Sequence, residues 1–209
     1  LWIAIAIAIR RADGGPALFR QPRAGLHGAP FTLYKFRSMV PEADERLGDL
    51  VDLDNLREPV FNLREDPRVT RIGRLLRRTS LDELPQLWNV LKGEMSLVGP
   101  RPERMELVAR YTPLQRRRLK AKPGITGYQQ VVSRGDPSLH RRVELDLFYL
   151  KHQGFFLDMV ILAKTLWVVA RGTGLTAAAG PARTEPDSDG SQAPADGSPA
   201  RARGDALHP

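Results

Sequence analysis

Two adjacent carboxylates, Asp82 and Glu83, follow a pair of arginines at Arg77 and Arg78 and precede a further arginine at Arg101. Guanidinium groups pair strongly with phosphate oxygens, and Mg²⁺ is commonly held by one or two carboxylates together with substrate phosphates. Carboxylates among arginines therefore indicate a site that handles phosphate together with a divalent metal. The two acids could divide the chemistry, one attacking a phosphorus centre while the other binds the metal.

The same carboxylates also have a purely structural interpretation. Ser80 and Glu83 show the spacing of a helix capping box, in which the acids would only stabilise the start of a helix. Pro85 stands where such a helix would already need its backbone donor, so its start is ambiguous. Neighbouring side chains on a helix point about 100° apart. The cap and the active site both remain open from this segment alone.

Other candidates lie further along the chain. Arg101 is flanked by prolines on both sides, which fix the backbone and would present its guanidinium with little loss of entropy. Lys35 and Arg37 are two residues apart in a predicted strand and would share one face, although a solvated polar face is the commoner explanation of such a pair. Asp146 and Tyr149 fall one helical turn apart.

Composition limits the classes of protein to consider. The 209 residues suffice for one sizeable domain, and the absence of cysteine excludes disulfides, thiolate metal sites and cysteine nucleophiles. The net charge is +8, with three arginines and five acidic residues in 172–209 leaving that segment at −2 and residues 1–171 at +10. A basic body suits nucleic acid, an anionic membrane surface or a phosphorylated substrate.

To bring the candidate residues together, the chain must fold into helices and short strands. The patterns predict strands at 31–39 and 128–132 and helices at 72–78, 84–92, 104–120, 139–151 and 155–171. Turns are expected at 66–68 and 123–127, and a loop at 16–30 that could include a short strand at 17–20. The segment 41–56 is acidic and helix-prone. The last helix is mostly apolar and would be buried, or would lie at a membrane interface with Trp167 at headgroup level.

The two ends of the chain differ from this body. Residues 1–9 alternate isoleucine and alanine, which suits a strand with one bulky face or the end of a membrane-embedded helix, although a helical span needs about 20 apolar residues. Residues 172–209 lack aromatic side chains and are rich in small and polar residues, so they are predicted to be disordered.

Taken in order, several segments resemble the bacterial sugar transferase family, the monotopic phosphoglycosyl transferases that act on polyprenyl phosphate. The resemblance is carried by residues 19–25, 34–39, 66–73, 77–102, 122–127 and 144–149. It implies a compact, mostly helical α+β catalytic domain at 10–171 with interfacial amphipathic helices. Residues 1–9 would be the remnant of a re-entrant membrane helix. The expected location is the bacterial inner membrane, with the active site on its cytoplasmic face.

The resemblance also implies a reaction. A sugar-1-phosphate would pass from a nucleotide diphosphate sugar, expected to be a UDP-sugar, to undecaprenyl phosphate, with release of a nucleoside monophosphate. Asp82 would be the nucleophile that carries the phosphosugar, ionised and with its pKa kept low by nearby arginines, and Glu83 would help to hold Mg²⁺.

The remaining candidates take lesser roles in the same resemblance. Arg77 and Arg101 would hold phosphates, with Arg78, Lys35 and Arg37 as second-rank candidates. Asp146 and Tyr149 would be substrate-side or structural residues.

Two rival hypotheses remain. One is a non-catalytic basic protein that binds a membrane or nucleic acid, based on the positive body and the arginines of 116–118. No nucleic-acid module is recognised, so no nucleic-acid partner is expected. The other is a degenerate family member that serves as a membrane scaffold.

Overall fold

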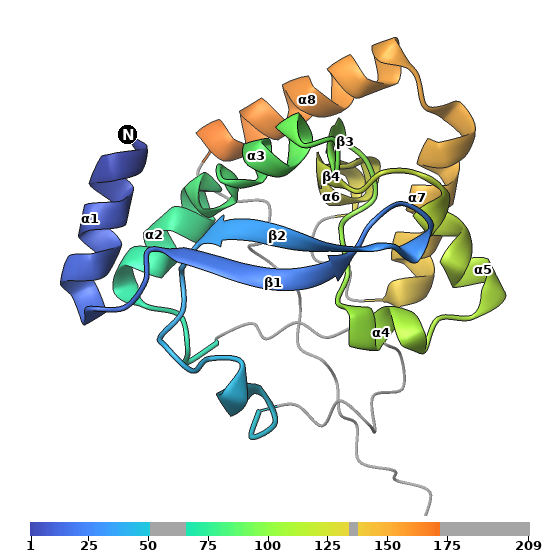
Figure 1. The fold of residues 1–209 in the computed structure, drawn as a ribbon. Coiled ribbons are helices and arrows are strands. Elements are labelled where there is room, and N and C mark those ends of the chain that lie inside the picture. The colour runs from blue at the N-terminus through green and yellow to red at the C-terminus, as the bar shows by residue number, and fades with distance from the viewer. Residues whose placement is uncertain (51–65, 134–137, 172–209) are drawn as a thin grey trace, which may run out of the picture.

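The computed structural model describes residues 1–50, 66–133 and 138–171. Within them helices combine with two small two-stranded sheets, which confirms the α+β class (Figure 1). The predictions for 51–56 and for the tail at 172–209 lie outside the described residues. In the described part of 41–56 the expected helix is reduced to turns and one short 3₁₀ helix, η2 (Glu45–Leu47).

A β-hairpin crosses the middle of the molecule (Figure 1). Strand β1 (Leu18–Ala24) pairs antiparallel with β2 (Pro30–Phe36), with Phe19 opposite Lys35 and Gln21 opposite Leu33. The strand expected at 31–39 is thus confirmed, although it ends at Phe36. Within the loop expected at 16–30, β1 occupies residues 18–24 and so extends the short strand considered at 17–20, and a 3₁₀ helix, η1 (Leu26–Gly28), follows it.

Helices α2 (Arg71–Thr79) and α3 (Gln86–Leu91) confirm the two helices expected on either side of the carboxylates. Thr70 caps α2, its Oγ1 accepting a hydrogen bond from the amide of Gly73 at 2.9 Å. Gly73 is required where α2 crosses the chain at Ser38, because a Cβ there would lie 1.8 Å from the Ser38 carbonyl oxygen. Between the two helices the chain forms the 3₁₀ helix η3 (Leu81–Glu83).

The second sheet is small and parallel. It consists of β3 (Ser96–Val98) and β4 (Gly124–Thr126), so part of the expected turn at 123–127 is a strand. The following residues form the helix α6 (Tyr128–Val132), and the strand expected at 128–132 was wrong. Tertiary packing overrides the β-propensity of the valines, since the ring of Tyr128 stacks on that of Phe148 with centroids 4.9 Å apart.

The single helix expected at 104–120 was also wrong. The segment consists of α4 (Met105–Ala109), α5 (Pro113–Arg116) and the 3₁₀ helix η4 (Arg117–Lys120). Pro113 lacks the amide hydrogen that a continuous helix needs and fits the first turn of a new one. Thr112 and Gln115 exchange side-chain-to-backbone hydrogen bonds in a capping box that starts α5.

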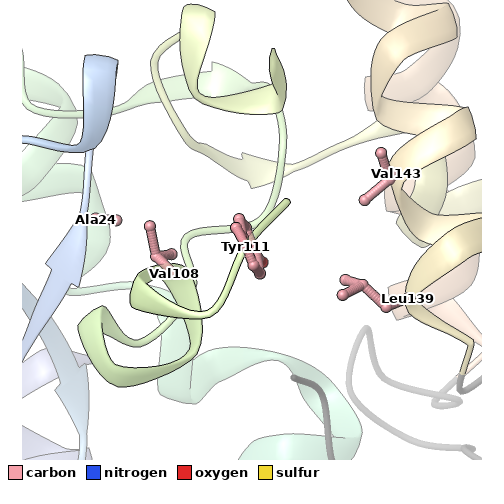
Figure 2. Close-up of a cluster of buried hydrophobic side chains, with 5 residues drawn as sticks. All are labelled: Ala24, Val108, Tyr111, Leu139 and Val143. Atoms are coloured by element: carbon pink, nitrogen blue, oxygen red, sulfur yellow. The ribbon is translucent and has the colours of Figure 1, made fainter. Parts of the chain in front are cut away.

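Helices α7 (Leu139–His152) and α8 (Phe155–Ala170) confirm the last two expected helices. One core cluster joins β1, α4 and α7 through Ala24, Val108, Tyr111, Leu139 and Val143 (Figure 2). A second apolar cluster joins β3, α7 and α8. The outer face of α8 stays exposed, through Phe155, Phe156, Met159, Val160, Leu166 and Trp167.

The alternating segment at the start of the chain belongs to the helix α1 (Trp2–Asp13), so its interpretation as a strand was wrong. Ile5 and Ile9, four residues apart, lie on one face and pack against Phe36 and Leu76. Among the residues that the structure describes, no helix is long and apolar enough to cross a membrane. A re-entrant role for this helix stays a prediction.

Candidate active site

Glu83 is buried at the end of η3, between strand β2 and the segment after β3. Its Oε1 accepts hydrogen bonds from Lys35 Nζ at 2.8 Å and from Arg101 Nη2 at 3.3 Å. Burial alone would raise the pKa of Glu83, but the charges and hydrogen bonds of Lys35 and Arg101 outweigh it and lower the pKa to about 2. Glu83 is therefore held as a carboxylate by two cations from separate elements.

Asp82, its neighbour, is buried without such a partner. Its Oδ1 is enclosed and forms no hydrogen bond with the described residues, and the same holds for Glu83 Oε2. The pKa of Asp82 is raised, first by burial and then by the adjacent charge of Glu83, against the opposing charges of Lys35, Arg77 and Arg101. The expectation that arginines keep this pKa low was wrong, because the cost of removing the carboxylate from water exceeds their attraction.

The expected capping box is not what holds these acids. Ser80 ends α2 with a left-handed backbone (φ 56°), and its side chain forms no capping hydrogen bond in η3. The carboxylate of Glu83 is directed to Lys35 and Arg101 instead. Its contacts therefore lie on β2 and on the segment after β3 rather than within η3.

Arg77, in the last turn of α2, borders the same acids. Its Nε donates a hydrogen bond to Ser38 Oγ at 2.9 Å, which fixes the guanidinium on the side of α2 that faces β2. Burial lowers its pKa, while the charge of Asp82 raises it. Arg78, one residue further along, is exposed.

Arg37 does not share the surroundings of Lys35, contrary to the predicted common strand face. The strand ends at Phe36, and Arg37 turns toward the end of α1, where its guanidinium forms a two-pronged ion pair with Asp13. Its Nε also donates to the carbonyl of Pro16 at 2.6 Å. Arg37 thus ties α1 to the hairpin.

Asp146 and Tyr149 have different partners, and within the described part of the chain neither pairs with Asp82 or Glu83. Asp146 pairs with the buried Arg118 at 2.6 Å, and Arg118 Nη2 donates to the carbonyl oxygen of Arg101 at 3.2 Å. Tyr149 donates to Asp158 Oδ1 at 2.8 Å, between α7 and α8. Among the described residues, Asp146 is therefore linked to the candidate site through Arg118 and the backbone of Arg101.

The arginine run at 116–118 is divided in the same way. Arg118 is 2% exposed and points inward, whereas Arg116 and Arg117 are exposed. The run does not present three adjacent cations to a partner, which removes much of the basis for the nucleic-acid hypothesis.

A small cavity of about 40 Å³ opens beside Glu83, enough for about two or three water-sized groups. It is lined by Arg23, Leu33, Lys35, Glu83, Gln86, Arg101 and Pro102. Arg23 and Gln86 were not among the residues predicted to form the site. Arg23 could have been found from the alternation of residues 19, 21 and 23, had β1 been recognised as a strand along its whole length.

Mg²⁺ is usually bound by one or two carboxylates together with substrate phosphates and water. The described residues contain no group of three or more histidine, cysteine, aspartate or glutamate side chains that could hold a metal. They do contain two neighbouring carboxylates, Asp82 and Glu83, each with one enclosed oxygen that lacks a partner. This set fits a magnesium ion that completes its shell with substrate phosphates and water.

Comparison with known proteins places this site in a family. The model of the family described as "Bacterial sugar transferase" matches residues 1–172, and the chain belongs to that family. The sugar transferase EpsL of Bacillus subtilis is 46% identical over 167 residues, which cover 80% of this chain and 76% of EpsL.

Two other relatives are longer. The galactosyl transferase CpsE of Streptococcus agalactiae is 46% identical over 165 residues, 78% of this chain and 37% of CpsE. The undecaprenyl-phosphate galactose phosphotransferase of Salmonella typhimurium is 48% identical over 166 residues, 78% of this chain and 35% of that enzyme. The chain thus spans about a third of the length of these two relatives.

Proposed function

We propose that this chain transfers a sugar-1-phosphate from a nucleotide diphosphate sugar, with UDP as the nucleotide, to undecaprenyl phosphate, and so begins the assembly of a polysaccharide or glycoconjugate. Family membership and the substrate named for the Salmonella relative support this class of reaction. The observation that carries the proposal is the buried Asp82, whose enclosed Oδ1 has no partner among the described residues, beside a Glu83 held by two cations.

The reaction has two displacements at the phosphorus that bears the sugar. First, an oxygen of the Asp82 carboxylate bonds to that phosphorus, the anhydride bond to the nucleotide phosphate breaks, and its electron pair leaves with the nucleoside monophosphate. Second, a phosphate oxygen of undecaprenyl phosphate bonds to the same phosphorus, and the bond to Asp82 breaks. Both groups attack in their anionic forms, so no proton is transferred within either displacement.

The environment of Asp82 suits a carboxylate nucleophile. A buried carboxylate with an oxygen that forms no hydrogen bond, as for Asp82 Oδ1 among the described residues, is less stabilised than one in water, and the raised pKa expresses this higher basicity. The adjacent cations Lys35, Arg77 and Arg101 still favour the ionised form. In its ionised form the group is thereby a stronger nucleophile than an exposed aspartate.

The cations around the acids would hold the phosphates. Arg101 and Lys35 each donate one hydrogen bond to Glu83. A guanidinium has five N–H donors and an ammonium has three, so both side chains have further N–H groups that can bind phosphate oxygens. Arg77 adds a third cation near Asp82. Glu83, together with Asp82, would hold Mg²⁺, which neutralises charge on the diphosphate when bound.

The surface of the molecule supports action at a lipid layer. Besides the outer face of α8, helix α3 exposes Leu87, Trp88 and Leu91. Exposed apolar residues in such number indicate contact with an apolar partner, and a polyprenyl substrate is itself found in a membrane. We infer a location at the cytoplasmic face of the bacterial inner membrane.

The test is release of a nucleoside monophosphate from a panel of UDP-sugars, in detergent, with undecaprenyl phosphate and Mg²⁺. Wild-type protein is expected to release it with at least one sugar, and Asp82→Asn to lose at least about 10³-fold in rate, since removal of a covalent nucleophile costs on that order or more. Asp49→Asn, an exposed aspartate away from the site, is the matched control and should retain the rate. If the Asp82→Asn protein remained active, Asp82 could not be the nucleophile.

A further inference from the structure

Arg23 lies on the wall of the cavity beside Glu83. It belongs to β1 and stands opposite Phe31 of β2, as Phe19 stands opposite Lys35. Directly opposed residues of an antiparallel pair point to the same side of the sheet, and alternate residues share a face. Arg23 and Lys35 therefore both extend from the hairpin toward η3 and α3.

The partners of the Arg23 guanidinium are neutral. Its Nη2 donates to Gln21 Oε1 at 2.6 Å and its Nη1 to the carbonyl of Pro102 at 3.3 Å. Its Nε is enclosed and has no hydrogen-bond partner within the described part of the chain. Across those same residues, none of the carboxylates forms an ion pair with Arg23.

Arg23 stays positively charged although its hydrogen-bond partners are neutral. Burial lowers its pKa to about 10, helped by Arg101 and Arg104 and opposed by Glu103 and Asp44, so the group is still a cation at neutral pH. A largely buried cation without an anionic partner costs free energy that a purely structural side chain would not need to incur. The arrangement is explained if a bound anion completes it.

The remaining lining of the cavity favours such an anion. Three cations, Arg23, Lys35 and Arg101, face a single carboxylate, Glu83. The Oε1 of Glu83 already accepts from the other two cations, and Glu103, the carboxylate that acts most strongly on Arg23, is paired with Arg118 at 3.5 Å. Positive charge is therefore in surplus on the Arg23 side. A phosphoryl group carries one or two negative charges and several acceptor oxygens, and arginine is the side chain best suited to bind it in a forked manner.

We propose that Arg23 is a further substrate-binding residue and that the cavity between Arg23, Lys35 and Arg101 receives a phosphoryl group. The group could come from the nucleotide diphosphate sugar or from the polyprenyl phosphate, because both carry the same chemistry. Its assignment to a substrate rests on the proposed transferase function, whereas the binding of the anion does not.

The first test is a ³¹P NMR titration of the full chain in detergent with inorganic phosphate and pyrophosphate, without other substrates. Arg23→Gln should weaken binding by about tenfold or more, since one charge-assisted hydrogen bond to the anion is lost. Arg23→Lys should weaken it less, because the charge remains but the fork does not. Arg20→Gln is the matched control from the same strand: Arg20 is exposed, and its loss removes the same charge.

Two results would overturn the proposal: binding as tight in folded Arg23→Gln as in the wild type, or an equal loss in Arg20→Gln. An unchanged melting temperature verifies folding. If Arg23→Gln fails to fold, Arg23→Lys decides, with a loss of about threefold or more expected and unchanged binding contradicting the proposal.

A second measurement identifies the source of the phosphoryl group. A rise in KM for the nucleotide sugar alone, with kcat little changed, assigns the cavity to the donor, and a rise for undecaprenyl phosphate alone assigns it to the acceptor. If the wild-type chain shows no transfer but its phosphate binding depends on Arg23, the proposed function fails while the anion site stands.

Discussion

At the scale of residues, Asp82 and Glu83 show how two adjacent carboxylates acquire different properties. Glu83 receives hydrogen bonds from Lys35 and Arg101, and its pKa falls to about 2. Asp82 receives none at Oδ1 and has a raised pKa. The two acids differ because the cations are aimed at one of them, and this difference supports separate roles in attack and in charge neutralisation.

Because the fold disfavours the ionised form of Asp82, we expect Asp82→Asn to stabilise the protein at neutral pH while removing activity. A neutral side chain of the same shape avoids the cost of the buried charge, and single stabilising substitutions commonly add about 0.5–2 kcal/mol. Thermal unfolding at pH 7 measures the effect. A lower melting temperature for Asp82→Asn would show that the carboxylate stabilises the fold.

Glu83 differs from Asp82 in that its ionised form stabilises the fold, so its contribution to stability depends on pH. A carboxylate whose pKa is depressed in the folded state adds stability above its unfolded pKa, near 4.5, and loses it as the pH falls toward about 2. The contribution is on the order of 3 kcal/mol. Glu83→Gln should therefore lower stability at pH 7 and make it less dependent on pH between 4.5 and 2.

The measurement is thermal unfolding of the wild type and Glu83→Gln at pH 7 and pH 3. Glu106→Gln, an exposed glutamate on α4, serves as the control and should follow the wild type at both values. A Glu83→Gln protein that loses as much stability on acidification as the wild type contradicts the assignment.

At the scale of elements, the site depends on the close approach of α2 to Ser38. Gly73→Ala would bring a Cβ to 1.8 Å from the Ser38 carbonyl oxygen, and the backbone would have to move. We expect a loss of about 1–3 kcal/mol and a weaker contact between Arg77 and Ser38. Gly48→Ala is the control, with nothing near its Cβ and a right-handed helical backbone, and should be neutral or slightly stabilising.

Some helices and strands could be predicted from the sequence, and others could not. Helices with clear periodicity, such as α2, α7 and α8, were found, because their signal is local. The break at Pro113 was missed because the apolar pattern continues across it, and only the start of β1 was predicted, at 17–20, because Pro22 and Gly25 suggested a loop. In the candidate site Asp82, Glu83, Lys35 and Arg101 were identified, but Arg23 was not, since only the hairpin register aligns it with Lys35.

At the scale of the whole molecule, the described residues combine a cation-rich site with an exposed apolar surface. On α8, Phe155 is 73% and Phe156 is 85% exposed. Residues 1–171 carry a charge of +10. Both features favour an anionic lipid surface, where apolar side chains enter the interface and basic residues attract the headgroups.

This arrangement predicts the effect of polar substitutions on lipid binding. The double variant Phe155→Ser and Phe156→Ser should bind vesicles of phosphatidylcholine and phosphatidylglycerol at least about tenfold more weakly, since each buried phenylalanine contributes about 1.5–3 kcal/mol. Leu114→Ser, an exposed apolar residue on α5, is the control. Co-sedimentation measures binding, and an equal loss in both proteins would argue against a specific role of α8.

The central claim is that Asp82 carries the phosphosugar, and intact-protein mass spectrometry tests it most directly. The wild-type chain, incubated with a UDP-sugar that it accepts and Mg²⁺ but without undecaprenyl phosphate, should gain the mass of one sugar phosphate. The added mass should map to the peptide containing Asp82, be absent in Asp82→Asn, and disappear when undecaprenyl phosphate is added. Turnover with both substrates but no adduct on Asp82 under any of these conditions would contradict the account.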